Sequence, residues 1–137
     1  MKIFTVHDQT LAFYAPYIDV TKRAEYRPDA SVERAIVATG AQHIFFIPTN
    51  YRVYLKHLEP GTTLPNAYWD YLSGVCGQHQ LKCTNLTEPL TAAADRLLKT
   101  GQLVWWNDDT HWNARGMAVA ARVVADRLGA QPALKKP

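Results

Sequence analysis

The sequence lacks a long hydrophobic run. Its longest apolar stretches, residues 44–47 and 117–121, are far shorter than the roughly 18 residues that a membrane-spanning helix requires. The first ten residues also lack the apolar core of a secretory signal, because His7 and Asp8 interrupt it. We therefore expect no membrane span and no signal peptide in this sequence.

Neither sign of charge dominates. Fifteen Lys and Arg residues against twelve Asp and Glu give a net charge of +3, and the basic residues are scattered except for Lys135 and Lys136. Because a nucleic-acid-binding surface needs a basic patch or stripe, we expect no nucleic-acid partner. Residues 130–137 are expected to form a flexible, solvated tail.

Cysteine is scarce, with Cys76 and Cys83 the only two. A structural zinc site needs four ligands, and the neighbouring His79 would raise the number to only three, so we expect neither a metal ion nor a cofactor. A disulfide between the two is conceivable in an oxidising compartment. Buried free thiols are the simpler expectation and are favoured here. The cysteines therefore leave the compartment open.

What is present is the composition of one globular domain. The 137 residues are 47% hydrophobic and 20% charged, and a chain of this length can bury a single core, so we expect one domain over residues 1–137. Short apolar runs alternate with amphipathic stretches. This alternation predicts an α/β fold of three layers, with a mostly parallel sheet and helices on both faces.

The expected elements follow from local signals. Strands are predicted at residues 2–6, 43–47, 82–86 and 103–106, and helices at about 29–39, from Pro65 onward, from Thr87 toward Gly101, and over 114–128. Residues 49–63 are predicted to be a polar loop, and the aromatic segment 11–17 has no clear assignment. Three or four strands are few for such a sheet, so we expect an incomplete portion of the fold.

Residues 107–113, with the sequence Asn-Asp-Asp-Thr-His-Trp-Asn, carry the most chemical information. They lie between a predicted strand and a predicted helix, at the edge of the sheet where α/β proteins bind ligands. An imidazole with a nearby carboxylate is the minimum for a general base with an orienting partner, which here means His111 with Asp109 or Asp108. Helix capping by Asp109 and Asn113 beside a structural His111 explains the same residues. A metal site is a weaker alternative, since no second ligand cluster is visible.

Three segments resemble one enzyme family. Asp-Thr-His-Trp-Asn at 109–113, followed by Arg115-Gly116 and an Ala-rich helix, resembles the C-terminal Asp/His block of SGNH-type (GDSL-like) hydrolases. The similarity is to the subgroup related to bacterial polysaccharide O-acetyltransferases and acetylesterases. Residues 44–54 resemble that subgroup's strand-Pro-Thr-Lys-x-x-Val-Tyr segment, with Asn50 in place of Lys. Residues 84–90 resemble its strand-to-helix turn, with Asn85 in place of Asp.

This resemblance implies a flavodoxin-like α/β fold and an esterase or O-acetyltransferase activity on acyl esters, most of all acetyl esters of carbohydrate. His111 would be the catalytic base and Asp109 its orienting acid, with Asp108 as the alternative. The residues implied to contact the substrate are Trp112, Asn113, Asn50 and Arg52. Trp105, Trp106 and Trp112 are expected either to line a sugar-binding surface or to be core and rim residues. The resemblance also suggests a periplasmic or envelope location.

Half of the family's site is missing from the sequence. The two serines, Ser31 and Ser73, do not lie in a Gly-Asp-Ser turn, and no Gly-x-Asn-Asp segment is present. The chain is therefore expected to be inactive by itself. Three explanations stay open: the C-terminal portion of a longer enzyme, which is favoured, a chain that pairs with a serine-bearing partner, or a degenerate relative that is a non-catalytic binding or assembly module. An incomplete sheet would expose apolar residues near 3–6 or 43–47, so we also expect self-association or pairing with a missing N-terminal region.

Overall fold

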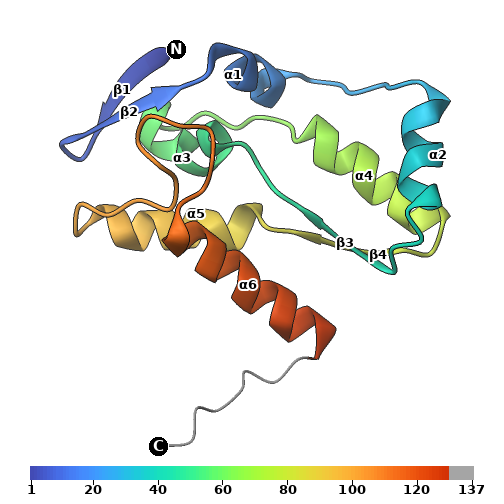
Figure 1. Cartoon of the computed structure of the whole chain (residues 1–137). Helices are drawn as coiled ribbons and strands as arrows, with labels where there is room; N and C mark the ends of the chain where they lie inside the picture. The colour runs from blue at the N-terminus through green and yellow to red at the C-terminus, as the bar shows by residue number, and fades with distance from the viewer. Residues whose placement is uncertain (130–137) are drawn as a thin grey trace, which may run out of the picture.

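The structure is a computed structural model in which residues 1–129 are described. The predicted flexible tail, residues 130–137, lies outside the described residues. Within residues 1–129 the chain forms four strands and six helices (Figure 1). In chain order these are β1 (Lys2–Val6), β2 (Gln9–Phe13), α1 (Ala15–Lys22), α2 (Ala30–Ala38), β3 (His43–Phe46), α3 (Asn50–Leu58), α4 (Ala67–Gln78), β4 (Lys82–Asn85), α5 (Thr87–Leu98) and α6 (Ala114–Leu128).

The predicted α/β class is confirmed. β3 and β4 pair in parallel, from His43 opposite Lys82 to Phe46 opposite Asn85. α4 packs against β4, and Figure 1 shows α4 on one side of the β3–β4 pair and α6 on the other. The described residues thus form two small sheets, one antiparallel and one parallel. None of the helices among the described residues is long and apolar enough to cross a membrane.

The first predicted strand has a different partner from the one expected. β1 pairs antiparallel with β2, through a turn in which His7 and Asp8 adopt positive φ angles, rather than joining the parallel sheet. The predicted strand at residues 103–106 is wrong, because only Trp105 makes an isolated antiparallel bridge, to Trp112. The parallel sheet of the described residues therefore has two strands instead of three or four. The apolar character of Leu103, Val104 and Trp105 reflects burial in the core rather than strand pairing, and Trp106 is exposed.

Helix ends follow the local sequence signals closely. The side chain of Asp29 accepts a hydrogen bond from Ser31 N and caps α2, and Gly40 follows that helix with a φ of 66°. α6 begins after Asn113 and ends at Leu128, and the following Gly129 adopts a left-handed backbone conformation. At α5 the N-cap residue is Leu86 instead of the expected Thr87, and it makes no side-chain capping bond; Asn85 Oδ1 accepts a hydrogen bond from Thr87 N.

The predicted loop at 49–63 is wrong, because it contains α3. Thr49 Oγ1 accepts a hydrogen bond from Arg52 N and so caps this helix. Its buried residues are spaced as a helix requires, with Tyr51, Tyr54 and Leu55 facing the core. The interspersed polar residues Arg52, Lys56 and His57 concealed the pattern; Lys56 is exposed, whereas Arg52 and His57 are half-buried. α3 packs against α5, and α5 also packs against α6.

The aromatic segment 11–17 also has partners within the chain. Leu11 and Phe13 are buried in the core, and the Phe13 ring lies 5.5 Å from that of Tyr51. Only Tyr14 and Tyr17 from this segment expose large apolar rings. The segment that the sequence left without an assignment therefore packs in part against the chain's own core.

The cysteines are paired, not free. Cys76 near the end of α4 and Cys83 in β4 form a disulfide, with their Cα atoms 6.2 Å apart. The expectation of free thiols is thus wrong. The disulfide forms because of the geometry of the α4–β4 connection. A tight turn with Gln80 at positive φ reverses the chain and brings the two residues together.

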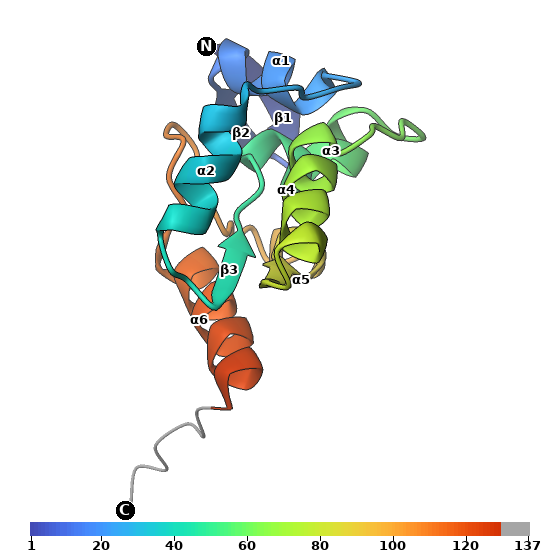
Figure 2. The ribbon, with the colours of Figure 1, turned by 90° about the vertical axis from the view of Figure 1, so that its right-hand side faces the viewer.

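The core is displaced from the parallel sheet toward α3 and α5. Its largest fully buried members lie in β2, α3, the β4–α5 junction, α5 and the segment that precedes α6. They are Phe13, Tyr51, Tyr54, Leu86, Leu90, Val53 and Val104. All four β3 residues are only half-buried. α6 projects away from the rest of the molecule in both ribbon views, and Met117 and Leu128 on it are exposed (Figures 1 and 2).

Candidate functional site

The loop of residues 107–112 is held at both ends by backbone hydrogen bonds. Trp106 N donates to His111 O over 3.2 Å, and Asn113 N donates to Val104 O over 3.1 Å. Ala12 N of β2 donates to Asn107 O over 2.7 Å, which ties the loop to the N-terminal hairpin. Trp105 Nε1 also donates to Thr110 O over 3.0 Å. The loop is therefore a closed turn with a defined geometry.

Asp109 and His111 are brought together within this loop. Asp109 Oδ1 lies 2.7 Å from His111 Nδ1 and also accepts hydrogen bonds from the backbone N–H groups of Thr110 and His111. The His111 hydrogen bond, aided by the backbone donors, lowers the pKa of the Asp109 carboxyl below its ordinary value. His111 Nε2 has no hydrogen-bond partner among residues 1–129, and the His111 side chain is 77% exposed. One ring nitrogen is thus oriented by a carboxylate while the other is open to a ligand.

Asp108 does not share this arrangement. Its side chain is exposed and makes no hydrogen bond within the described residues. Of the two carboxylates that the sequence offered, the structure brings Asp109 to the imidazole.

Asn113 holds the loop to the start of α6. Its Oδ1 accepts hydrogen bonds from Arg115 N and Gly116 N, and its Nδ2 donates to Leu103 O and Trp105 O. These four bonds use the full capacity of a side-chain amide, and the residue is 6% exposed. The structure therefore gives Asn113 a structural position, below the surface that a substrate would touch.

Asn50 and Arg52 support the site from α3. Asn50 is buried, and its Nδ2 donates to the backbone oxygen of Asp109 over 3.4 Å, which connects α3 to the loop. The Arg52 guanidinium donates to the carbonyl oxygens of Thr21, Leu64 and Pro65. Burial lowers the pKa of Arg52 from its ordinary value.

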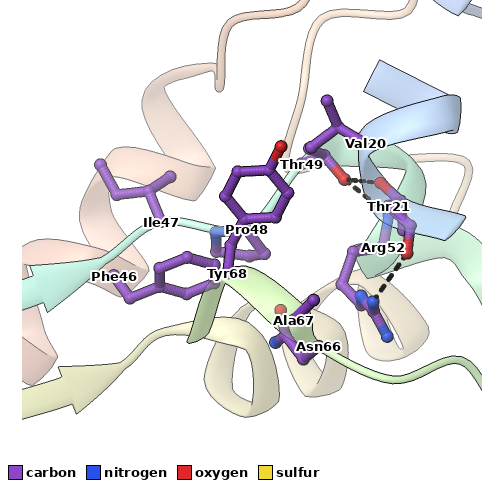
Figure 3. A pocket seen from close by; sticks show the side chains of 10 residues that line it. All are labelled: Val20, Thr21, Phe46, Ile47, Pro48, Thr49, Arg52, Asn66, Ala67 and Tyr68. Atoms are coloured by element: carbon purple, nitrogen blue, oxygen red, sulfur yellow. Dashed lines mark hydrogen bonds between the residues drawn. The ribbon is translucent and has the colours of Figure 1, made fainter. Parts of the chain in front are cut away.

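Arg52 lines a small cavity of about 120 Å³ between α1, α3 and the start of α4 (Figure 3). Thr21 and Thr49 share a hydrogen bond of 2.6 Å beside it, and Figure 3 shows the Arg52 side chain extending from α3 to the Thr21 carbonyl. Through these hydrogen bonds the guanidinium links α3 to α1 and to the α3–α4 connection.

A larger hollow of about 340 Å³ lies on the His111 side of the Ile47–Thr49 segment. We call it the His111 hollow, and its lining comes from three distant parts of the chain: Tyr17, Ile47, Pro48, Thr49, Trp105, Thr110, His111 and Trp112. Trp105 and Trp112 line this hollow, whereas Trp106 does not. The sequence did not identify Tyr17 and Ile47 as lining residues. Their apolar side chains were the one signal in the sequence that could have indicated it.

Among the described residues, no activated nucleophile lies beside His111. Thr110 Oγ1 is engaged with Asp109, and Thr49 Oγ1 with Thr21 and the α3 backbone. Ser31 on α2 and Ser73 on α4 are exposed and lie outside the hollow. Within residues 1–129 no group of three or more His, Cys, Asp or Glu side chains is arranged to hold a metal ion.

Comparison with known proteins gives a likeness in fold. No family model matches this chain, and no curated protein matches it in sequence. Among solved structures, the O-acetyltransferase domain of Pseudomonas putida AlgJ is similar over 100% of this chain and 50% of that chain, with a TM-score of 0.55 and 18% sequence identity. The chain thus spans half the length of that structure. At this identity the similarity establishes a shared α/β fold.

Proposed function

We propose that this chain supplies the acid–base half of an SGNH-type acyl-transfer site, acting on acetyl esters of carbohydrate. His111 is the general base and Asp109 its orienting acid. The observation that carries the proposal is the 2.7 Å contact between Asp109 Oδ1 and His111 Nδ1, which leaves Nε2 open beside a hollow. The fold shared with an O-acetyltransferase domain supports it.

In the proposed reaction the hydrogen bond to Asp109 keeps the proton of the neutral imidazole on Nδ1. The lone pair on Nε2 then accepts the proton of a hydroxyl nucleophile as that oxygen bonds to the acyl carbon. The same proton passes to the departing alcohol oxygen when the tetrahedral intermediate collapses. Asp109 stabilises the transient imidazolium because it stays ionised at neutral pH.

The nucleophile itself belongs to another segment or another chain in this proposal. The hollow offers no serine or cysteine, since Ser31 and Ser73 lie elsewhere and both cysteines are in the disulfide. The acyl chemistry therefore needs a polypeptide that brings a serine and oxyanion donors to the open side of His111.

A non-catalytic binding or assembly module is the second candidate. The specific observation in its favour is the same absence of a serine or cysteine from the His111 hollow among the described residues. In that case the Asp109–His111 pair would only shape the loop.

The two candidates differ in an activity test. The DNA on both sides of this reading frame is translated to find a Gly-Asp-Ser segment, and the product is expressed joined to, or together with, this chain. We expect fluorophosphonate labelling and acetate release from acetylated sugar in the combined protein. His111→Ala is expected to lower kcat by about 10²–10⁴-fold, with Asp108→Asn as the matched control near wild type.

The isolated chain provides the converse measurement. Without a nucleophile the isolated chain should not be labelled by fluorophosphonates, and it should hydrolyse aryl acetates no faster than free imidazole does. Saturable turnover that disappears in His111→Ala would show a nucleophile within the chain. Full activity of the combined protein in His111→Ala would refute the assigned base.

A further inference from the structure

Tyr17 is an exposed aromatic ring beside the proposed base, although it precedes His111 by 94 positions in the sequence. It lines the His111 hollow and is 39% exposed. The Tyr14 ring meets it edge to face, with centroids 5.5 Å apart and an interplanar angle of 79°. Its hydroxyl has no hydrogen-bond partner within residues 1–129. The ring thus presents an apolar surface and a free polar group to whatever enters the hollow.

The backbone position of Tyr17 is fixed by the anchoring of α1. Thr21 Oγ1 lies 2.6 Å from the backbone oxygen of Tyr17, and the same hydroxyl is 2.6 Å from Thr49 Oγ1. Arg52 Nη2 donates to the backbone oxygen of Thr21 over 3.0 Å. The adjacent Ile18 is buried in the core. These contacts hold α1 against the start of α3. The backbone that carries Tyr17 is therefore held beside the hollow.

The hollow carries little charge. No Lys, Arg, Asp or Glu side chain is among the described residues that line it, and its titratable members are His111 and Tyr17. The Arg52 guanidinium, which could have matched an anion, donates to three backbone carbonyls instead. An anionic sugar entering here would lose hydration without gaining a cationic partner.

We propose that Tyr17 is the stacking wall of an acceptor subsite that selects an uncharged pyranose ring. The inference rests on the proposed function, and it names the substrate class of the same site. The apolar face of the sugar packs on the Tyr17 ring, with Ile47 and Trp112 beside it, and a ring hydroxyl points toward His111 Nε2. Aromatic rings provide this kind of amphipathic contact surface at low cost in conformational entropy.

The test is a binding titration of the whole chain, followed by nuclear magnetic resonance of ¹⁵N-labelled protein. The probes are xylotriose, which is neutral, and trigalacturonate, an anionic sugar of equal length. We expect xylotriose to shift the signals of Tyr17, Ile47 and His111, and trigalacturonate to bind more weakly. Tyr17→Ala should weaken xylotriose binding about five- to tenfold, the loss of one aromatic contact. Tyr17→Phe, which keeps the ring, should bind within about twofold of wild type.

Trp106→Ala is the matched control, because Trp106 is 56% exposed yet lies outside the hollow, and it should not change xylotriose binding. Unchanged binding in Tyr17→Ala, tighter binding of trigalacturonate, or no binding of xylotriose would each overturn the subsite. The proposed reaction can fail separately from the subsite. If His111→Ala keeps transfer activity in the combined protein while Tyr17→Ala still weakens xylotriose binding, the assignment of His111 as the base is wrong and the subsite is retained.

Discussion

At the scale of single residues, the hydrogen bonding of His111 defines its chemistry. A carboxylate acceptor at Nδ1 makes that nitrogen the donor, so the lone pair available for a proton is on Nε2. Asp109 is in turn held by two backbone N–H groups of the same loop, and its backbone oxygen is held by Asn50. The imidazole is therefore oriented by a chain of contacts that reaches α3.

The first prediction concerns the pKa of Asp109. Its hydrogen bond to His111 lowers the pKa of the carboxyl from an ordinary 3.8, so the charged form stabilises the loop above that pH and this contribution is lost as the pH falls through the lowered value. His111→Ala should raise the Asp109 pKa toward 3.8. Carbonyl carbon shifts followed against pH measure it, with Asp108→Asn as the control. An Asp109 pKa that is the same with and without His111 would contradict the pairing.

A second prediction compares two asparagines that precede helices. Asn113 caps α6 and satisfies two buried carbonyls, whereas Asn66 precedes α4 without a side-chain capping bond. Asn113→Ala should therefore lower the free energy of unfolding by about 2–3 kcal/mol. Asn66→Ala should change it by less than about 0.5 kcal/mol. Chemical denaturation measures both, and equal effects would show that the Asn113 network contributes nothing of its own.

At the scale of elements, the close approach of α6 to the preceding chain sets the geometry of the site. The segment at Val104 and the first turn of α6 meet at Gly116, where a Cβ atom would overlap the carbonyl oxygen of Val104. Only glycine permits this approach, so the His111 loop is held between two tightly packed backbone segments.

This contact predicts opposite effects for two glycine substitutions. Gly116→Ala should destabilise the protein by about 1–3 kcal/mol, because the backbone of residue 104 has to move. Gly74→Ala in α4 meets no atom within 4 Å, and it should be neutral or stabilise by up to about 1 kcal/mol through helix propensity. Thermal denaturation distinguishes the two. A stable Gly116→Ala variant with an unchanged His111 environment would show that the approach is looser than described.

The disulfide is the other feature at this scale, since it links α4 to β4. Cys76→Ser/Cys83→Ser should lower the free energy of unfolding by about 2–3 kcal/mol, the value expected for closing so short a loop. Wild type in reductant should match the double variant. Alkylation of both thiols in the untreated native protein would contradict the pairing.

For the whole molecule, the exposure of the parallel sheet matters most. Every β3 residue is only half-buried, and Ile47, just after that strand, is 51% exposed. Central strands of α/β sheets are ordinarily covered on both faces. Apolar surface of this kind promotes association with another polypeptide or another copy.

We therefore expect the chain to form dimers or larger species at micromolar concentration, or to be marginally stable. Light scattering measures the mass, and Ile47→Lys should shift it toward the monomer. Joining a Gly-Asp-Ser-bearing segment, if one is encoded beside this frame, should raise the Tm and abolish self-association. A monomer with a high Tm would contradict this prediction and leave the sheet stable as it is.

Local signals in the chain were sufficient for the α/β class, for β1, β4 and the limits of α2 and α6. They placed a carboxylate near His111 but left Asp109 and Asp108 as alternatives, and the folded loop brings Asp109 to the ring. Capping residues and a following glycine act over a few residues, so their effects can be predicted without the fold. The catalytic roles of His111 and Asp109 stay predictions.

Contacts between distant residues determined the rest. α3 is stable because Tyr51 and Tyr54 find a core built from β2 and α5, and the thiols are joined because the α4–β4 turn brings them together. Tyr17 lines the same hollow as His111 because Thr21 anchors α1 to the start of α3. Such contacts have no signature within a short window of sequence, since burial and long-range hydrogen bonding exist only once the chain has folded.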